Sequence, residues 1–323
     1  MKRGGMLRFI LHRLALAIPT LFGVAVLIFL MLRVIPGDIV EIKLRADGGQ
    51  VTQAMIEQER HRLGLDRPLP VQFASWLEGF VTGDLGTSMW TDRPVIVEIR
   101  ERLELTVEVA ILAAVIATVI AIPLGSLAAL FAGSVLDYTI RLVTLGGLAA
   151  PAFWVGMLII LGLLTLFHWM PPMTFVPIYR DPIGNLSQLI FPALAIGYRF
   201  AAVVTRMTRS AVLEVMREDY IRTARAKGVY ERLVITRHTL PNALLPTITV
   251  IGLEFAFLIG GLVVTEEVFN LNGIGRLFVQ AVSRNDFILI QTLVMIIAAV
   301  FVLTNIVVDI ICAALDPRLR AGR

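Results

Sequence analysis

Six long apolar stretches set the strongest constraint on how this chain can fold. They cover residues 14–32, 105–131, 140–167, 189–204, 243–264 and 288–314. One transmembrane helix uses about 20 mostly apolar residues. Only 17% of the residues are charged and the mean hydropathy is +0.80, values that exclude an ordinary soluble chain or a disordered one. The sequence therefore predicts an all-α membrane protein with six transmembrane helices.

The first apolar stretch follows a basic start that contains Lys2, Arg3, Arg8 and Arg13. A signal peptide would have a shorter apolar core, of about 7 to 15 residues. We therefore interpret residues 1–32 as an N-terminal tail and a retained first transmembrane helix.

Residues 33–104 form the one long polar stretch of the sequence, with 9 basic and 12 acidic residues. We expect them to form a small extracytoplasmic domain between the first and second transmembrane helices. Residues 105–323 then form the membrane core with helices 2–6, and 206–242 is its long inner loop. Proline and glycine inside several of these helices predict kinks at packing sites or cavities.

The distribution of Lys and Arg predicts the orientation of the chain. Four connecting segments, 2–13, 132–141, 206–240 and 318–323, hold 16 of them, whereas the short loops 168–188 and 265–287 hold three. Short basic segments stay on the cytoplasmic side. Both termini are therefore expected in the cytoplasm, with 33–104 outside. The net charge of +4 is explained by these flanks, so we expect membrane lipid and not nucleic acid as a partner.

The sequence contains no motif for covalent chemistry. None of its three lysines lies in a phosphate-binding loop, and Gly273-Ile274-Gly275 lacks the third glycine of a dinucleotide site. Neither a nucleophile motif nor a pair of carboxylates in a plausible cleft emerges. One cysteine and four histidines give no metal-ligand cluster. We expect no catalytic residue, no bound metal and no cofactor in this chain.

The inner loop 206–242 is too long for a simple helix connection, which usually takes about 2 to 8 residues. Its apolar spacing is helical, and Lys227-Gly228 is typical of a helix C-terminus. A second short helical stretch, 230–238, leads to Leu240-Pro241. Two interpretations are open: an amphipathic helix that lies on anionic lipid, or a rigid lever that a cytosolic protein grips.

The same loop resembles the signature loop of ABC importer permeases. In that superfamily the pattern is Glu-Ala-Ala, three residues, Gly, nine residues, Ile-x-Leu-Pro. Alignment on Gly228 places Arg222-Thr223-Ala224 under the triplet and Leu240-Pro241 on the Leu-Pro, while His238 replaces the isoleucine. These departures match the dipeptide, oligopeptide and nickel branch. Further segments similar to that branch are 64–70, 83–88, 267–276 and 315–318.

The resemblance implies the type I importer permease fold and a subunit that forms the pore of an ATP-driven importer in the bacterial inner membrane. A binding protein would dock outside, a second permease would complete the pore, and two ATPases beneath would bind the ATP and Mg. Peptides are the expected solute; nickel complexes, glutathione-like compounds and opine-like or sugar-like solutes are the alternatives. A rival class is a self-sufficient channel or secondary transporter, which the lack of internal repeats disfavours.

The resemblance also assigns a set of residues to ATPase coupling, as a helix seated in an ATPase groove. These residues are Glu218, Asp219, Tyr220, Arg222, Thr223, Ala224, Arg225, Ala226, Lys227, Gly228, His238, Leu240 and Pro241.

Four ionisable residues fall inside expected transmembrane helices, where charge is costly and often functional: Glu108, Arg199, Glu254 and Asp309. Glu254 lies deepest. It either pairs with Arg199 in a structural contact or faces the pore, where it could meet a cationic group of the solute.

Outside the membrane, Phe73, Trp76, Leu77 and Phe80 share one helical stripe. The stripe either packs the outer domain onto the membrane surface or helix tops, or helps to dock the binding protein. Trp76, Arg67 and Asp84 are the docking candidates.

Overall fold

The computed structural model describes residues 3–34, 39–46, 52–62, 64–172 and 174–315. Within these ranges the chain is helical, apart from turns, loops and one isolated β-bridge between Thr87 and Pro94. The prediction of an all-α membrane protein is confirmed. Five described helices are long and apolar enough to cross a membrane, and a sharply bent helix pair raises the number to six.

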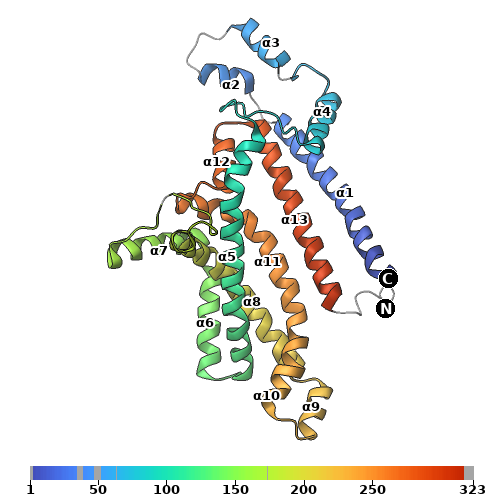
Figure 1. Cartoon of the computed structure of the whole chain (residues 1–323), viewed down its shortest axis with the longest axis vertical. Coiled ribbons are helices and arrows are strands. Elements are labelled where there is room, and N and C mark those ends of the chain that lie inside the picture. Colours follow the sequence, from blue (N-terminus) through green and yellow to red (C-terminus); the bar gives the residue numbers. More distant parts are fainter. Residues whose placement is uncertain (1–2, 35–38, 47–51, 63, 173, 316–323) are drawn as a thin grey trace.

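Four long helices make up the centre of the bundle (Figure 1): α5 (Val95–Leu130), α8 (Pro182–Val215), α11 (Leu240–Val268) and α13 (Phe287–Leu315). In the most apolar part of α8, 67% of the residues are buried, against 11% in α1 (Arg3–Val34). Small side chains of α5, among them Ala113 and Ala117, pack against Leu189 and Ala193 of α8. The expected fourth span is therefore the best enclosed helix of the bundle.

The third expected span, 140–167, is not one helix. It consists of α6 (Val135–Ala149) and α7 (Ala152–Phe167), which meet at 105°. Ala150 between them is extended, as a residue before proline prefers. With 15 residues, α6 rises only about 22 Å, and α7 projects sideways from the bundle (Figure 1). The apolar run that the sequence presents as one crossing is therefore broken.

Two other boundaries differ from the sequence prediction. Helix α8 continues to Val215, so ten residues expected in the inner loop belong to the helix. Helix α5 begins at Val95 and carries the last residues that had been placed in the outer domain. In both cases the apolar stretch covers only the part of the helix that lies in the membrane. The helix continues into charged residues, which the apolar pattern does not indicate.

The region between α1 and α5, which the sequence predicts to be the outer region, contains α2 (Ile39–Ala46), α3 (Gln53–Arg62) and α4 (Leu69–Thr82). The stripe on α4 packs on α1: the ring centroids of Phe73 and Phe29 are 5.3 Å apart, and those of Trp76 and Phe29 6.2 Å. This contact supports the packing interpretation of the stripe. At the same end of the molecule, α12 (Ile274–Ser283) is held between α11 and α13.

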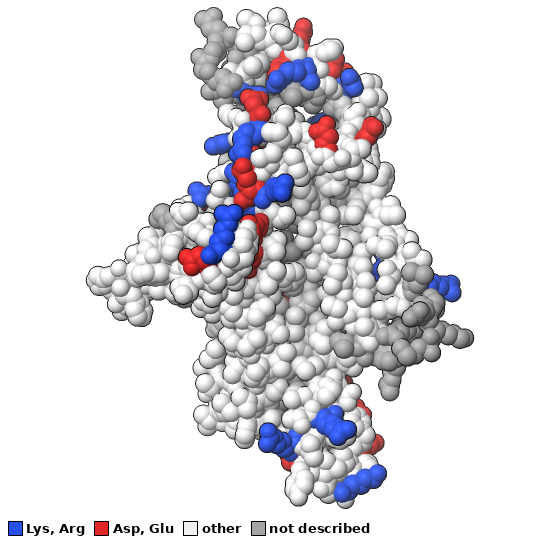
Figure 2. Space-filling view, viewed as in Figure 1, with Lys and Arg blue, Asp and Glu red and all other residues white. Residues whose placement is uncertain are grey.

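Charged side chains gather at the two ends of the molecule. Figure 2 shows them around α2–α4 and down to the level of α7, and again over α9 and α10, with a largely uncharged surface between these two groups. Such a surface is what the hydrocarbon core of a bilayer requires.

Candidate coupling helix and outer pocket

Helix α9 (Asp219–Ala226) lies at one end of the molecule, where the chain turns from α8 to α11 (Figure 1). Gly228 follows the helix with φ = +76°, a conformation that favours glycine. The Gly228 N–H donates to the Arg225 carbonyl at 2.9 Å, and the Val229 N–H donates to the Ala224 carbonyl at 3.2 Å. The helix end that the sequence predicted at Lys227-Gly228 therefore exists.

Most of the residues proposed for coupling are exposed. Among them only Ala224, His238 and Leu240 are partly buried. Ile221 is the one buried residue of α9 and is fully enclosed, in a helix that packs against η1 (Val234–Thr239). The apolar side of α9 is thus used inside the protein. It is not free to lie on lipid, so the geometry favours the lever interpretation.

An ion pair holds the far end of α9. Arg225 Nη2 lies 2.7 Å from Glu231 Oε1 and Arg225 Nε lies 3.1 Å from Glu231 Oε2. Glu231 opens the short α10 (Glu231–Leu233). The hydrogen bonds from Arg225 hold the pKa of Glu231 below its ordinary value, and those same bonds raise the pKa of Arg225. Both groups are therefore ionised at neutral pH.

The predicted second helical stretch consists of α10 and the π-helical turn η1, which runs into α11. The Thr239 hydroxyl donates to the Val234 carbonyl, five residues back, at 3.1 Å. Asn242 Nδ2 donates both to the His238 carbonyl at 2.8 Å and to the Tyr220 hydroxyl at 3.2 Å. Through this last contact α9 is joined directly to the start of α11.

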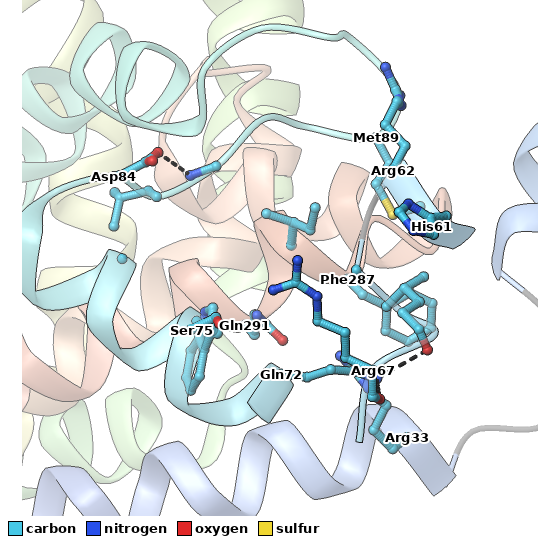
Figure 3. Close-up of a pocket in the computed structure, with 17 residues that line it drawn as sticks. Arg33, His61, Arg62, Arg67, Gln72, Ser75, Asp84, Met89, Phe287 and Gln291 are labelled. Atoms are coloured by element: carbon cyan, nitrogen blue, oxygen red, sulfur yellow. Dashed lines mark hydrogen bonds between the residues drawn. The ribbon is translucent and has the colours of Figure 1, made fainter. Parts of the chain in front are cut away.

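At the other end of the molecule, the three docking candidates line one pocket of about 470 Å³. Figure 3 shows it between α4, the end of α1 and the start of α13. Arg33 Nη2 donates to Gln72 Oε1 at 2.9 Å, and Gln72 Nε2 donates to the Arg67 carbonyl at 2.7 Å. These bonds fix the pocket wall at Arg67, from which the Arg67 guanidinium extends (Figure 3).

The pocket is rich in positive charge. Arg33, Arg62 and Arg67 line it, against one lining carboxylate, Asp84. Arg62 is paired with Glu59 at 2.6 Å, which leaves Arg33 and Arg67 as the cations without a carboxylate partner in the described part of the chain. Gln291 of α13 is 5% exposed, and its Oε1 has no hydrogen-bond partner. The cations of the pocket are suited to an acidic group of a partner, and the unused acceptor of Gln291 requires a hydrogen-bond donor from it. No group of three His, Cys, Asp or Glu side chains that could hold a metal occurs among the described residues.

Comparison with known proteins identifies the family. The profile of the family described as "Binding-protein-dependent transport system inner membrane component" matches residues 121–321, and that of the corresponding N-terminal region matches residues 6–110. The chain belongs to this family. It is a multi-pass membrane permease subunit and not an enzyme, and it works with a substrate-binding protein and an ATPase.

Three relatives extend over nearly the whole permease. The dipeptide transport system permease protein DppB of Escherichia coli (strain K12) is 38% identical, over 98% of this chain and 99% of its own. The di/tripeptide transport system permease protein DppB of Pseudomonas aeruginosa is also 38% identical, over 98% and 100%. A probable peptide ABC transporter permease protein of Sinorhizobium fredii, y4tP, is 36% identical, over 97% and 99%.

The intramembrane candidates of the permease all have partners. Arg199 Nη1 lies 3.3 Å from Glu254 Oε2, and Arg13 Nε lies 3.1 Å from Asp309 Oδ2. Glu108 accepts hydrogen bonds from the Asn185 side chain and from the backbone N–H of Ile178. Asp309 thus joins α13 to α1, and Glu108 joins α5 to the chain that enters α8. The four residues do not converge on one site.

The sequence did not indicate the buried carboxylates Glu98, Asp137, Glu266 and Asp286 of the permease, and the last two share one segment. Glu266 and Asp286 are 0% and 1% exposed, and both lie in 265–287, which the sequence presents as an outer loop. Burial raises the pKa of Asp286. The family motif at 267–276 lies between these two residues and includes neither of them. The motif residues 316–318 lie outside the described residues.

Proposed function

We propose that this permease translocates peptides across the bacterial inner membrane, with both termini in the cytoplasm. Relatives along its full length have names that refer to dipeptides, di/tripeptides or peptides. The charge bias of the short loops supports the orientation. A second permease subunit would complete the pore, and two ATPase subunits would bind ATP and Mg.

The observation that carries the mechanism is the exposed, firmly anchored helix α9. It is closed at Gly228, fixed to α10 by Arg225 and Glu231, and linked to α11 by Asn242. An ATPase that grips the exposed face of α9 would move α8 and α11 together, because the helix cannot swing freely. Closure of the two ATPases would in this way switch the pore between its inward-facing and outward-facing states.

The outer pocket would provide the contact with the binding protein, at the opposite end of the molecule from α9. Its lining by Arg67, Trp76 and Asp84 supports its use by the binding protein. Because it is built from α1, α4 and α13, a partner seated in it would contact helices of the membrane core and not the outer region alone.

The test is uptake of a radiolabelled dipeptide into proteoliposomes that contain the complete transporter, its binding protein and ATP. Gly228→Asp should abolish uptake without lowering the amount of assembled permease, since it places a charge on the gripped surface. Gly228→Asn, which tolerates the left-handed conformation, should retain most of the uptake.

Gly228→Asn is also the matched control, because it changes the same position, which has open space around it, without adding a charge. Normal uptake by Gly228→Asp would contradict the coupling role. A permease that purifies alone as a stable, conducting oligomer would contradict the proposed function as a whole.

A further inference from the structure

A second cavity, of about 530 Å³, lies between α6 and α8 towards the α9 end of the molecule. Tyr138, Arg141 and Leu145 line it from α6, and Thr205, Arg206 and Arg209 from α8. Neither the coupling helix nor the outer pocket uses these side chains.

The cavity has unneutralised positive charge. Of its three arginines, Arg209 is paired: its Nε and Nη2 lie 2.8 and 2.7 Å from the two carboxylate oxygens of Asp137. Arg141 and Arg206 are exposed. Among the described residues neither of them has a carboxylate at ion-pair distance, and the one carboxylate that interacts with Arg141, Asp137, is already paired with Arg209. The guanidinium of Arg141 lies 5.7 Å from the centroid of the Tyr138 ring, which holds it at the cavity.

An unsatisfied buried hydroxyl lines the same cavity. Thr205 is 2% exposed, and its Oγ1 has no hydrogen-bond partner. One turn further along α8, the Thr208 hydroxyl donates to the Val204 carbonyl at 2.8 Å, so the helix can satisfy such a group by itself. A buried polar group without a partner is costly. A bound ligand with acceptor oxygens would supply the partner that Thr205 lacks.

The apolar side of the cavity indicates what kind of anion fits. Leu142, Leu145 and Leu148 line it along α6, and the first two are 71% and 61% exposed. A small inorganic anion would leave these leucines uncovered. A ligand with a phosphate and long alkyl chains would cover both parts. Basic pockets between membrane helices on the cytoplasmic side commonly hold lipid headgroups.

We propose that this cavity binds one anionic phospholipid. Its phosphate lies between Arg141 and Arg206 and accepts a hydrogen bond from Thr205, and its acyl chains follow the three leucines of α6. The lipid joins α6 to α8 close to the segment that leads into α9, and thereby steadies the base of the lever. This inference concerns lipid retention and holds or fails independently of the transported solute.

The test is a titration of the purified transporter complex with phosphatidylglycerol in detergent, with bound lipid counted by native mass spectrometry. Each cation near an anionic headgroup contributes roughly a factor of five, so Arg141→Gln combined with Arg206→Gln should weaken binding about 25-fold. Arg232→Gln combined with Arg237→Gln, which removes two exposed charges from α10 and η1, should leave it unchanged. Thr205→Val should weaken binding by a smaller factor.

Phosphatidylcholine and inorganic phosphate separate the possible sources of the anion. We expect phosphatidylcholine to bind more weakly than phosphatidylglycerol, and inorganic phosphate not to displace the lipid. Displacement by inorganic phosphate would show a simple anion site and overturn the proposal. Equal lipid retention by the wild type and the double variant, with both properly assembled, would also overturn it and leave the cavity to a partner subunit.

Discussion

Glu266 accepts a hydrogen bond of 2.7 Å from the hydroxyl of Thr106, which lies 160 positions earlier in the chain. The same hydroxyl accepts from the backbone N–H of Ile274 at 2.8 Å, and the second Glu266 oxygen accepts from the backbone N–H of Arg276 at 3.0 Å. A Cβ atom at Gly273 would overlap the carboxylate, so the start of α12 approaches Glu266 as only glycine can. One buried carboxylate thus joins α5, α11 and α12.

Glu266→Gln should destabilise the outer end of the bundle. If the amide oxygen keeps the bond from Arg276, the amide NH₂ faces the Thr106 hydroxyl, whose proton then loses its acceptor, and a buried donor left unpaired costs about 1–3 kcal/mol. Thermal unfolding in detergent can be followed by the reaction of a thiol dye with Cys312, the single cysteine of the chain. Glu267→Gln is the matched control, because Glu267 is the exposed neighbour. Equal midpoints for the two variants would contradict the role assigned to Glu266.

Asp286 should make stability depend on pH. Its carboxylate accepts hydrogen bonds from the Ser88 hydroxyl and from the backbone N–H groups of Met89 and Leu289, while burial raises its pKa. Because the folded-state pKa lies above the ordinary value of about 4, the contribution is complete below that pH and is lost as pH rises through the folded pKa.

Asp286→Asn cannot titrate, so the excess stability of the wild type over this variant should shrink as pH rises from about 4 to 7. Unfolding midpoints of both proteins across that range provide the measurement. A difference that grows with pH would show that the hydrogen bonds to the carboxylate outweigh its burial.

Local features of the fold could be predicted from the sequence. The end of α9 depends on a lysine followed by a glycine, and Gly228 adopts the left-handed conformation that this pattern indicates. The apolar stretches predicted the positions of the membrane helices for a similar reason, because each stretch must be buried in the membrane whatever the rest of the chain does. Where neighbours in sequence determine the structure, the sequence was sufficient.

Relationships between distant residues could not be predicted. Glu266 and Asp286 have partners 160 and 198 positions away, and no spacing rule brings these together. Pro151 and the glycines before it predicted a kink in the run 140–167, but the run is apolar on both sides of Pro151, so its composition does not indicate a change of direction as large as 105°. Arg67 and Trp76 were predicted as docking residues, but the pocket they share also requires Arg33 of α1 and Gln291 of α13.

Arg67→Glu should weaken docking of the binding protein. The pocket is positive, so the partner is expected to present an acidic side chain, and like charges across an interface are costly. We expect the affinity measured by surface plasmon resonance on nanodisc-held transporter to fall at least about tenfold. Arg100→Glu makes the same charge change at an exposed outer position that does not line the pocket. Equal losses in both variants would indicate only long-range electrostatics.

The ion pair between Arg225 and Glu231 should matter for coupling more than for stability. Both side chains are exposed, so its loss should change stability by less than about 1 kcal/mol. Glu231→Arg should nevertheless reduce the ATP hydrolysis that the binding protein stimulates, because α9 loses its anchor to α10. The exchange Arg225→Glu with Glu231→Arg should restore part of it. No recovery in the exchanged variant would mean that Arg225 contacts the ATPase directly.

Arg199 and Glu254 provide the sharpest test of what intramembrane charge does in this permease. Glu254 is 14% exposed and Arg199 54%, so the loss of the arginine leaves the more buried charge unpaired. If the pair is structural, Arg199→Gln should lower the amount of folded permease in membranes more than Glu254→Gln does, and the double variant should recover it.

Quantitative immunoblots of membranes and dipeptide uptake, measured on the same preparations, separate this role from a direct role in the pore. Normal levels of Glu254→Gln together with lost uptake would place the carboxylate on the path of the solute. The structural role instead requires uptake to follow the amount of folded protein in all three variants. Since Arg199 and Glu254 come from α8 and α11, the two helices joined to α9, loosening them should also lower the coupling of ATP hydrolysis to transport.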